Sequence, residues 1–596
     1  MCSINLAVQF PGADFSSLQR MMLATQHRGP DLSCCEKVAD GIFVAANRLG
    51  ILDLSTEASM PFWSVDRKQV LAWNGAIYNH AQLKEQLLQQ GITFRTHSDT
   101  ETLLYWLKIF GEKRLSELHG MFALVFIDLE EKLVILARDY SGEKPLFFYK
   151  KGNGWLFSSE TRGIQAGLDE KVPVDKSGIP HHCWNRHPLP GKTLLHGIQQ
   201  VQPGSALILD LEGKLIHQKN WNFPPPLLSS NLDEQFESIL GQVTNQTLDT
   251  EVPLGMVLSG GADSSLLLAV AHEQGKLPTH TYTLCLEGKY RKKYADPLFS
   301  EEIRKKYPTD HRDILMNRDL LMQNWEEYIA NLDQPVGDSA SFLTWWIAKQ
   351  AKQEVRILVS GAGADELFGG YNRHEAFKFY LKHPILSRLL RKGKDFLPQG
   401  TALEKFAASM DKSPEATFIQ MSALGRIPAK SIEAYLQLYP NGPDSFKNAL
   451  EWDRTCYLCE DVLKIHDLAC SAHGIEGRSP YLHPQLLAWS KAIPEEVFLR
   501  EKGKIWIKKA LTKRNLGHIA QRKKLGFGLP LHEWMEEKEF RDWINAYIKN
   551  MDKYWHEAFP KELRVYLEKP EKLEKNRFLL TWNLFLLASW LNKQEK

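Results

Sequence analysis

The densest cluster of residues that could do chemistry is the run Ser-Gly-Gly-Ala-Asp-Ser-Ser at 259–265. It follows a buried-strand pattern at 255–258 and leads into an apolar helical pattern at 266–271. A glycine pair between a strand and a helix lets backbone N–H groups turn toward an anion, and the helix N-terminus adds a favourable dipole. Hydroxyls and a carboxylate in the same turn suit a phosphate group that carries a magnesium ion. No Gly-Lys-Ser/Thr follows, so this is not a Walker loop, and the sequence predicts a phosphate-binding loop of another kind.

A second chemical feature is the cysteine at position 2. Removal of Met1 would leave Cys2 with a free α-amine, whose reference pKa of about 7.7–8.0 makes much of it neutral near pH 7. Nucleophilic thiol and basic amine would then sit on one residue, as in other N-terminal nucleophiles. Taken alone, a cysteine at this position is as well explained by chance. The motifs that follow it favour a nucleophile.

Short motifs follow the cysteine in a fixed order. They are Arg28-Gly29-Pro30-Asp31, Asn47-Arg48-Leu49, Trp73-Asn74-Gly75-Ala76-Ile77-Tyr78-Asn79, Ser98-Asp99-Thr100-Glu101, Gly120-Met121-Phe122-Ala123, Arg138-Asp139 and Gly142-Glu143-Lys144-Pro145-Leu146. This series resembles the class II (N-terminal nucleophile) glutamine amidotransferase domain. The run at 259–265 is similar to the pyrophosphate loop of ATP-pyrophosphatases, which split ATP into AMP and pyrophosphate. Together they make the chain resemble the glutamine-hydrolysing asparagine synthetase family over nearly its whole length.

Composition narrows the class of protein further. The chain has 596 residues, and its 74 Lys+Arg nearly balance 72 Asp+Glu, which argues against a nucleic-acid partner. No secretory leader is recognised, and the apolar segment 578–591 is too short and polar to span a bilayer, so it predicts a packed helix and no membrane partner. Eight scattered cysteines suit a reducing, cytoplasmic location. A homodimer is left open.

The order of element patterns predicts two domains. Residues 1–220 alternate short β-patterned runs with helices, which predicts an α+β domain, and the resemblance implies an αββα sandwich. Three prolines mark residues 221–231 as a linker. In residues 232–596, helices alternate with buried strands, which predicts a parallel α/β sheet of the ATP-pyrophosphatase type. After about residue 375 the chain is predicted to be nearly all helix.

The resemblance assigns roles at a glutamine site. Cys2 would be the nucleophile, and the Asn74 side-chain amide and the Gly75 backbone N–H would form the oxyanion hole, a role that suits their donors. Arg48 would hold the glutamine carboxylate with a bidentate fork, and Asp99 would hold the α-ammonium. Ordinary structural ion pairs are the alternative for Arg48 and Asp99.

Two positions depart from the family's glutamine site. The family usually has glycine at position 3 and glutamate at position 76, where this chain has Ser3 and Ala76. Loss of one charge-assisted hydrogen bond to the substrate ammonium costs about 1.5–3 kcal/mol. We therefore expect glutamine affinity to be weakened by about ten- to hundredfold relative to a site with that glutamate.

The resemblance also assigns a site for Mg-ATP. The phosphate and adenine contacts would be Leu258, Ser259, Gly260, Gly261, Asp263, Ser264, Ser265, Leu284, Ser360 and Gly361. Asp263 and Asp365 would be the Mg²⁺ ligands, and Lys504 would stabilise the transition state. Asp365 lies in a run, 360–371, that follows a strand pattern at 357–359, and ligands of open α/β sheets bind at the carboxyl ends of strands. A solvent-exposed helix lysine is the alternative for Lys504.

The predicted activity is adenylation of aspartate and its amidation with ammonia from glutamine, giving asparagine, glutamate, AMP and pyrophosphate. Many family members have Glu or Asp where this chain has Ala362, as the base in amide formation, and His483 replaces a usual Asp. Alternatives are therefore kept: the same design acting on another carboxylate, a cyclase resembling β-lactam or lasso-peptide ring formers, and a catalytically weak nucleotide-binding protein. The intact Cys2 site disfavours the cyclase, which needs no ammonia.

Overall fold

The computed structural model describes residues 1–287, 290, 296–398, 401–522, 526–551, 553–572 and 577–595. Its N-terminal part contains two six-stranded antiparallel sheets. The first has the order β10 (Ile198–Gln200), β8 (Phe147–Lys151), β9 (Gly154–Ser158), β1 (Ser3–Val8), β3 (Ile42–Arg48), β2 (Leu32–Ala39). The second has the order β12 (Leu215–Asn220), β11 (Ser205–Asp210), β7 (Leu133–Arg138), β6 (Gly120–Asp128), β5 (Gln69–Ile77), β4 (Phe62–Trp63).

Helices cover the outer faces of these two sheets. α1 (Phe15–Ala24) and α4 (Thr161–Gly167) contact the first sheet, and α3 (Asp99–Phe110), which packs with α2 (His80–Gln89), contacts the second. Strands β1 and β6 are buried along their whole length, so their inner and outer faces are both covered. The predicted αββα sandwich is confirmed.

The C-terminal part is built on a five-stranded parallel sheet. Its order is β15 (Asp310–Met316), β14 (His280–Leu286), β13 (Leu254–Val257), β16 (Ile357–Val359), β17 (Glu476–Arg478). The predicted α/β sheet is confirmed. The prediction of nearly all helix after about residue 375 misses β17, a three-residue strand at the edge of the sheet.

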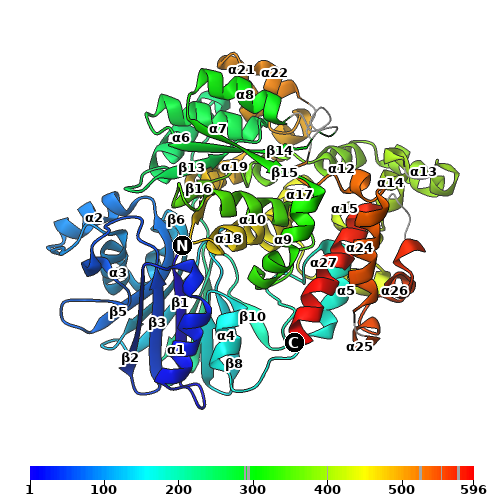
Figure 1. Ribbon diagram of the computed structural model, residues 1–596. Helices are drawn as coiled ribbons and strands as arrows, with labels where there is room; N and C mark the ends of the chain where they lie inside the picture. The colour runs from blue at the N-terminus through cyan, green and yellow to red at the C-terminus, as the bar shows by residue number, and fades with distance from the viewer. Residues whose placement is uncertain are drawn as a thin grey trace.

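Helices lie on both faces of the parallel sheet, with α6 and α7 on one side and α10 and α18 on the other (Figure 1). The helices through the sheet region are α6 (Leu232–Thr247), α7 (Ala262–Glu273), α8 (Asp296–Lys306), α9 (Arg318–Asn331), α10 (Ala340–Ala351) and α11 (Ala364–Phe368). Those that follow are α12 (Asn372–Lys382), α13 (Pro384–Lys392), α14 (Ala402–Ser409), α15 (Pro414–Ser422), α16 (Ala429–Leu436), α17 (Ser445–Trp452), the π-helix η7 (Asp453–Val462), α18 (Leu463–Ser471), α19 (Pro484–Ala492) and α20 (Glu495–Arg500). The last are α21 (Ile505–Lys513), α22 (Gly517–Gln521), α23 (Leu531–Trp534), α24 (Lys538–Lys549), α25 (Lys553–His556), α26 (Lys561–Glu568) and α27 (Phe578–Glu595).

The predicted C-terminal packed helix is observed as α27, whose middle is almost entirely buried. Among the described residues, none of the helices combines the length and apolarity needed to cross a bilayer. Helix α5 (Ile179–Asn185) belongs to the N-terminal part of the chain but lies against α27 in the lower right of Figure 1. The two parts of the chain are therefore interlocked.

Buried ion pairs join the two parts of the chain. The guanidinium of Arg28, which is fully buried, donates to Glu160 and to both carboxylate oxygens of Asp467 at 2.9–3.0 Å. Asp333 accepts from the backbone N–H groups of Thr161 and Arg162, each at 2.8 Å. Separating the two parts of the chain would leave these buried charges without partners, which is costly. The contacts therefore fix the position of the predicted glutamine site relative to the predicted ATP site.

Candidate active sites

The predicted glutamine-site residues meet at one cavity. Cys2, Arg48, Gly75 and Asp99 all line it, although Cys2 directly precedes β1 and the others come from β3, β5 and α3. Asn74 lies beside them, because its side-chain oxygen accepts from the backbone N–H of Cys2 at 3.0 Å. The structure thus brings together every residue that was predicted for glutamine hydrolysis.

Asn74 and Gly75 have the features of an oxyanion hole. The Asn74 amide nitrogen is buried and donates no hydrogen bond within the described residues. Gly75 has a φ of 152°, and a Cβ there would lie 1.9 Å from the Met121 carbonyl oxygen, so only glycine fits. Because a buried donor without a partner is costly, the Asn74 amide is best explained by an acceptor that arrives with the substrate.

The N-terminus is enclosed beside this cavity. Met1 is fully buried, and its sulfur lies 3.2 Å from the Lys144 ammonium. Burial lowers the pKa of the N-terminal amine to about 6 and raises that of the Cys2 thiol. An amine in these surroundings is mostly neutral near pH 7, as a base must be. With Met1 present, however, the amine is not on Cys2.

Arg48 and Asp99 are fixed in different ways. The Arg48 guanidinium donates to the backbone carbonyls of Ser55, at 2.6 Å, and of Asp53. Asp99 is at the first turn of α3 and accepts from the Ile77 N–H at 3.2 Å. Burial raises the pKa of the Asp99 carboxyl to about 7. At neutral pH the free site therefore holds this carboxyl in both protonation states.

If Asp99 holds the α-ammonium of glutamine, as the resemblance implies, its pKa predicts how glutamine binding depends on pH. Only ionised Asp99 attracts an ammonium, so below its pKa of about 7 the affinity is lost and above it the affinity reaches a plateau. We expect kcat/KM for glutamine hydrolysis to rise about tenfold per pH unit below this pKa. Steady-state glutaminase assays across pH check this. Asp99→Asn should remove this limb of the profile, and an unchanged limb in that variant would assign it to another group.

The C-terminal part of the chain contributes two residues that sequence reasoning missed. Glu476 and Arg478, from β17, line the same cavity as Cys2 and Ala76. The Arg478 Nε donates to Glu476 Oε1 at 2.9 Å, and both side chains are buried. Side chains at i and i+2 of a strand share a face, but a three-residue strand is too short to reveal that pattern. Glutamine would therefore touch both parts of the chain.

The predicted ATP-site residues also converge. Asp263 Oδ2 and Asp365 Oδ1 each lie 2.6 Å from the Lys504 ammonium. Burial opposes the charge on Lys504, but the two carboxylates outweigh it and raise the lysine pKa. Lys504 adopts a left-handed conformation with φ 59° at the start of α21, and its N–H donates to the Phe368 carbonyl at 2.8 Å. The solvent-exposed alternative for Lys504 is wrong, because its side chain is 9% exposed.

The two phosphate-loop motifs face one another because β13 and β16 are parallel neighbours. A Cβ on Gly361 would lie 3.1 Å from the Asp263 Cβ, and one on Gly370 would lie 2.1 Å from Asp365 Oδ1, so a side chain at the second position would displace the Asp365 carboxylate. Ser259 Oγ lies 3.2 Å from Ser264 Oγ and accepts from the Gly261 N–H at 3.3 Å. Of the remaining predicted contacts, Ser265 lies in the first turn of α7 and Leu284 on the neighbouring strand β14, and the loops carry the other three: Leu258, Gly260 and Ser360.

The departures at Ala362 and His483 have different locations. Ala362 is half-buried in the loop between β16 and α11, and the nearby Glu366 is buried. Burial, with Asp365 adding to it, raises the pKa of Glu366 to about 7, and Tyr371 Oη donates to its carboxyl at 2.6 Å. His483 instead lies between the two parts of the chain, stacked on Tyr78 with 5.6 Å between ring centroids.

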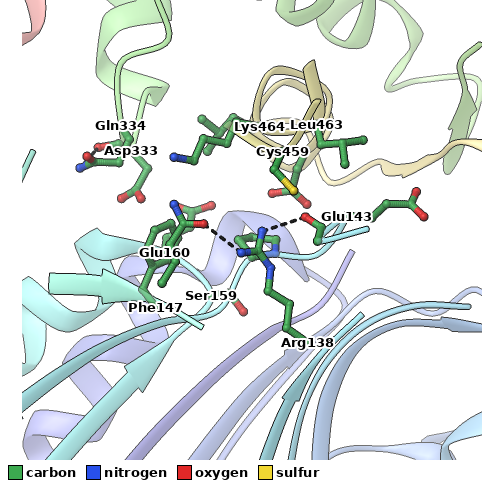
Figure 2. Close-up of a pocket in the computed structure, with 15 residues that line it drawn as sticks. Arg138, Glu143, Phe147, Ser159, Glu160, Asp333, Gln334, Cys459, Leu463 and Lys464 are labelled. Carbon is green, nitrogen blue, oxygen red and sulfur yellow. Dashed lines mark hydrogen bonds between the residues drawn. The ribbon is translucent and has the colours of Figure 1, made fainter. Parts of the chain in front are cut away.

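A separate cavity lies between the two parts of the chain (Figure 2). Arg138 and Glu143 line it from one side, and Cys459 and Lys464 from the other. It shares no lining residue with the glutamine cavity. Arg138 donates hydrogen bonds to Gln200 and to the Gly142 carbonyl, drawn as dashed lines in Figure 2. Its guanidinium is therefore held by the protein itself.

The fold and the two sites define an amidotransferase joined to an ATP-dependent domain. Residues 1–221 match the glutamine amidotransferase domain model, and residues 235–592 match that of asparagine synthase. The chain belongs to the asparagine synthase family.

Two curated relatives and one solved structure are similar to parts or most of the chain. The chain is 26% identical to asparagine synthetase [glutamine-hydrolyzing] 1 of Bacillus subtilis (strain 168), covering 97% of this chain and 94% of the relative. It is 30% identical to asparagine synthetase [glutamine-hydrolyzing] 3 of the same organism, covering 62% and 63%. Among solved structures, glutamine phosphoribosylpyrophosphate amidotransferase from B. subtilis matches 61% of this chain and 82% of its own, at 16% identity and a TM-score of 0.28.

Proposed function

We propose that the protein hydrolyses glutamine at Cys2 and uses the ammonia to convert aspartate to asparagine, with ATP split to AMP and pyrophosphate. The observation that carries this is the presence of two built sites in one interlocked chain. One is the cavity of Cys2, Arg48 and Asp99, and the other is the cluster of Lys504, Asp263 and Asp365. No disulfide joins the eight cysteines, all of which lie in the described residues, and this suits the reducing cytoplasm where we place the enzyme.

At the first site, the chain's own groups account for glutamine hydrolysis. After removal of Met1, the α-amine of Cys2 would be held by Asn74 Oδ1, as its nitrogen is here, and would take the thiol proton. The thiolate attacks the side-chain amide, and the Asn74 amide and Gly75 N–H stabilise the oxyanion. The amine then protonates the leaving ammonia, and water releases glutamate from the thioester.

At the second site, Lys504 and the loops position the nucleotide. The Asp263 and Asp365 carboxylates, which converge on the Lys504 ammonium here, would supply hard oxygen ligands to a Mg²⁺ ion. Bound there, the ion would neutralise phosphate charge. Lys504 donates to the phosphates as negative charge moves onto the leaving pyrophosphate, and the backbone N–H groups of 259–265 cradle it.

Ammonia attack on the acyl-adenylate gives a cationic amine that must lose a proton, and Ala362 cannot accept it. Glu366 follows four residues after Ala362 and has a pKa of about 7, but its carboxyl is buried and accepts a hydrogen bond from Tyr371. We propose that asparagine synthesis proceeds at a reduced rate with Glu366 or water as the base. The absence of a base at position 362 also favours the second candidate function, which is amidation of another carboxylate.

Ala362→Glu separates the two candidates. Positioned general bases contribute about 10²–10⁴-fold, so if aspartate is the acceptor the variant should form asparagine several-fold faster than wild type. Asparagine and pyrophosphate are both measured with glutamine, Mg-ATP and aspartate present. If neither protein releases pyrophosphate with aspartate while wild type does with another carboxylate, the asparagine assignment is wrong.

A further inference from the structure

Arg186 reaches from the N-terminal part of the chain into the ATP-dependent part. It follows α5, which is tied to α27 because Asn583 donates to the carbonyls of His182 and Cys183 at 2.8 and 3.1 Å. Arg186 has a left-handed φ of 71°, and its carbonyl accepts from the Gly337 N–H at 2.8 Å. This side chain is therefore held beside the loop at 333–339, which precedes α10.

The Arg186 guanidinium is mostly buried, but its contacts with carboxylates are too long to be hydrogen bonds. Its side chain is 15% exposed, and within the described residues it makes ion-pair contacts longer than hydrogen bonds: 3.9 Å from Nε to Asp338 and 3.7 Å from Nη1 to Asp461. The Asp461 Oδ2 atom is buried and accepts no hydrogen bond from any residue that the structure describes. A buried acceptor without a hydrogen bond is costly, so the Asp461 oxygen, beside a guanidinium held only by contacts longer than hydrogen bonds, marks a place for a ligand.

A continuous line of side chains connects this place to the ATP site. The Arg186 guanidinium lies 5.8 Å from the Tyr457 ring centroid, and the Tyr457 and Tyr371 rings are 5.6 Å apart, edge to face. Tyr371 in turn donates to Glu366, the neighbour of Asp365. Both tyrosines are only half-buried, so this wall is accessible.

We propose that Arg186 and Asp461 bind the α-carboxylate and the α-ammonium of the acceptor amino acid, whose distal carboxylate points toward Asp365. This rests on the proposed function and deepens it. Arg186 offers a planar fork that matches a carboxylate, and Asp461, with Asp338 beside it, offers oxygens to an ammonium. A zwitterion satisfies both groups, whereas a dicarboxylate without an ammonium leaves Asp461 unpaired. Arg186, from the N-terminal part of the chain, therefore completes the subsite for the acceptor amino acid.

Two fragments of aspartate test the assignment group by group. Succinate lacks the α-ammonium, and β-alanine lacks the α-carboxylate. Pyrophosphate release is measured with saturating Mg-ATP and ammonium salts, with each fragment as acceptor or, where it does not react, as a competitive inhibitor of aspartate. Arg186→Met should raise KM for aspartate and weaken succinate by about ten- to hundredfold, and leave β-alanine within about twofold. Asp461→Asn should weaken aspartate and β-alanine, and spare succinate.

Controls separate binding from folding. Arg356→Met removes another arginine that joins the two parts, paired with Asp31 at 2.7 Å, and should leave all three ligands unchanged. Arg186→Lys keeps the charge without the fork and should be intermediate. Glutaminase activity reports the fold in every variant.

The outcomes distinguish this inference from the proposed function. Equal losses for aspartate and β-alanine in Arg186→Met, or no loss, would overturn the subsite while aspartate amidation stands. Arg186-dependent use of a different amino acid, with aspartate inactive, would keep the subsite and overturn the asparagine assignment. If wild type releases pyrophosphate with no amino acid, both are wrong.

Discussion

Replacing Cys2 with alanine is expected to abolish glutamine-dependent synthesis and to leave ammonia-dependent synthesis within about twofold of wild type. No other thiol lines the glutamine cavity in the described residues, so the loss should be at least about 10³-fold, the scale seen when a nucleophile is removed. The ATP site should be unaffected, because it receives free ammonia from solution. Glutamate and asparagine formation are measured separately, with glutamine or ammonium chloride as the nitrogen source.

Cys34→Ala provides the matched control for this experiment. Cys34 is a half-buried thiol on β2, away from the lining of the cavity, and its loss should change neither activity. Glutaminase activity surviving in Cys2→Ala would remove Cys2 from the reaction. Loss of ammonia-driven synthesis in a folded Cys2→Ala protein would show that the two sites do not divide the work as proposed.

Long elements could be predicted from the sequence because their patterns repeat. The β-patterned runs predicted within residues 1–220 include those that form β5 and β6, which pair over nine positions. The strand β17 could not be predicted, because its three residues, Glu-Gly-Arg, contain no apolar side chain and its position is set by pairing with β16. Its side chains Glu476 and Arg478 were missed at the glutamine cavity for the same reason.

The candidate sites were predictable only where a local motif carries the chemistry. Asp263 and Asp365 occur in glycine-rich runs, so their roles could be inferred from the resemblance, and the parallel pairing of β13 and β16 explains why they meet. Arg186 has no motif around it. Its place depends on the docking of α5 against α27, a contact between residues about 400 positions apart that only tertiary structure shows.

Replacing Asp365 with asparagine is expected to abolish pyrophosphate release while glutamine hydrolysis continues. The change removes a charge that lies 2.6 Å from the Lys504 ammonium and a hard ligand for Mg²⁺, and removing one such group typically costs about 10²–10³-fold in kcat. Pyrophosphate and glutamate are assayed in the same reaction over a range of Mg²⁺ concentrations. Lys508→Met is the control, because Lys508 lies one turn along α21 from Lys504 and contacts neither carboxylate. Pyrophosphate release by this variant should stay near that of wild type. Near-normal release and unchanged Mg²⁺ dependence in Asp365→Asn would contradict the metal assignment. Loss of both products would instead show that Asp365 holds the fold together.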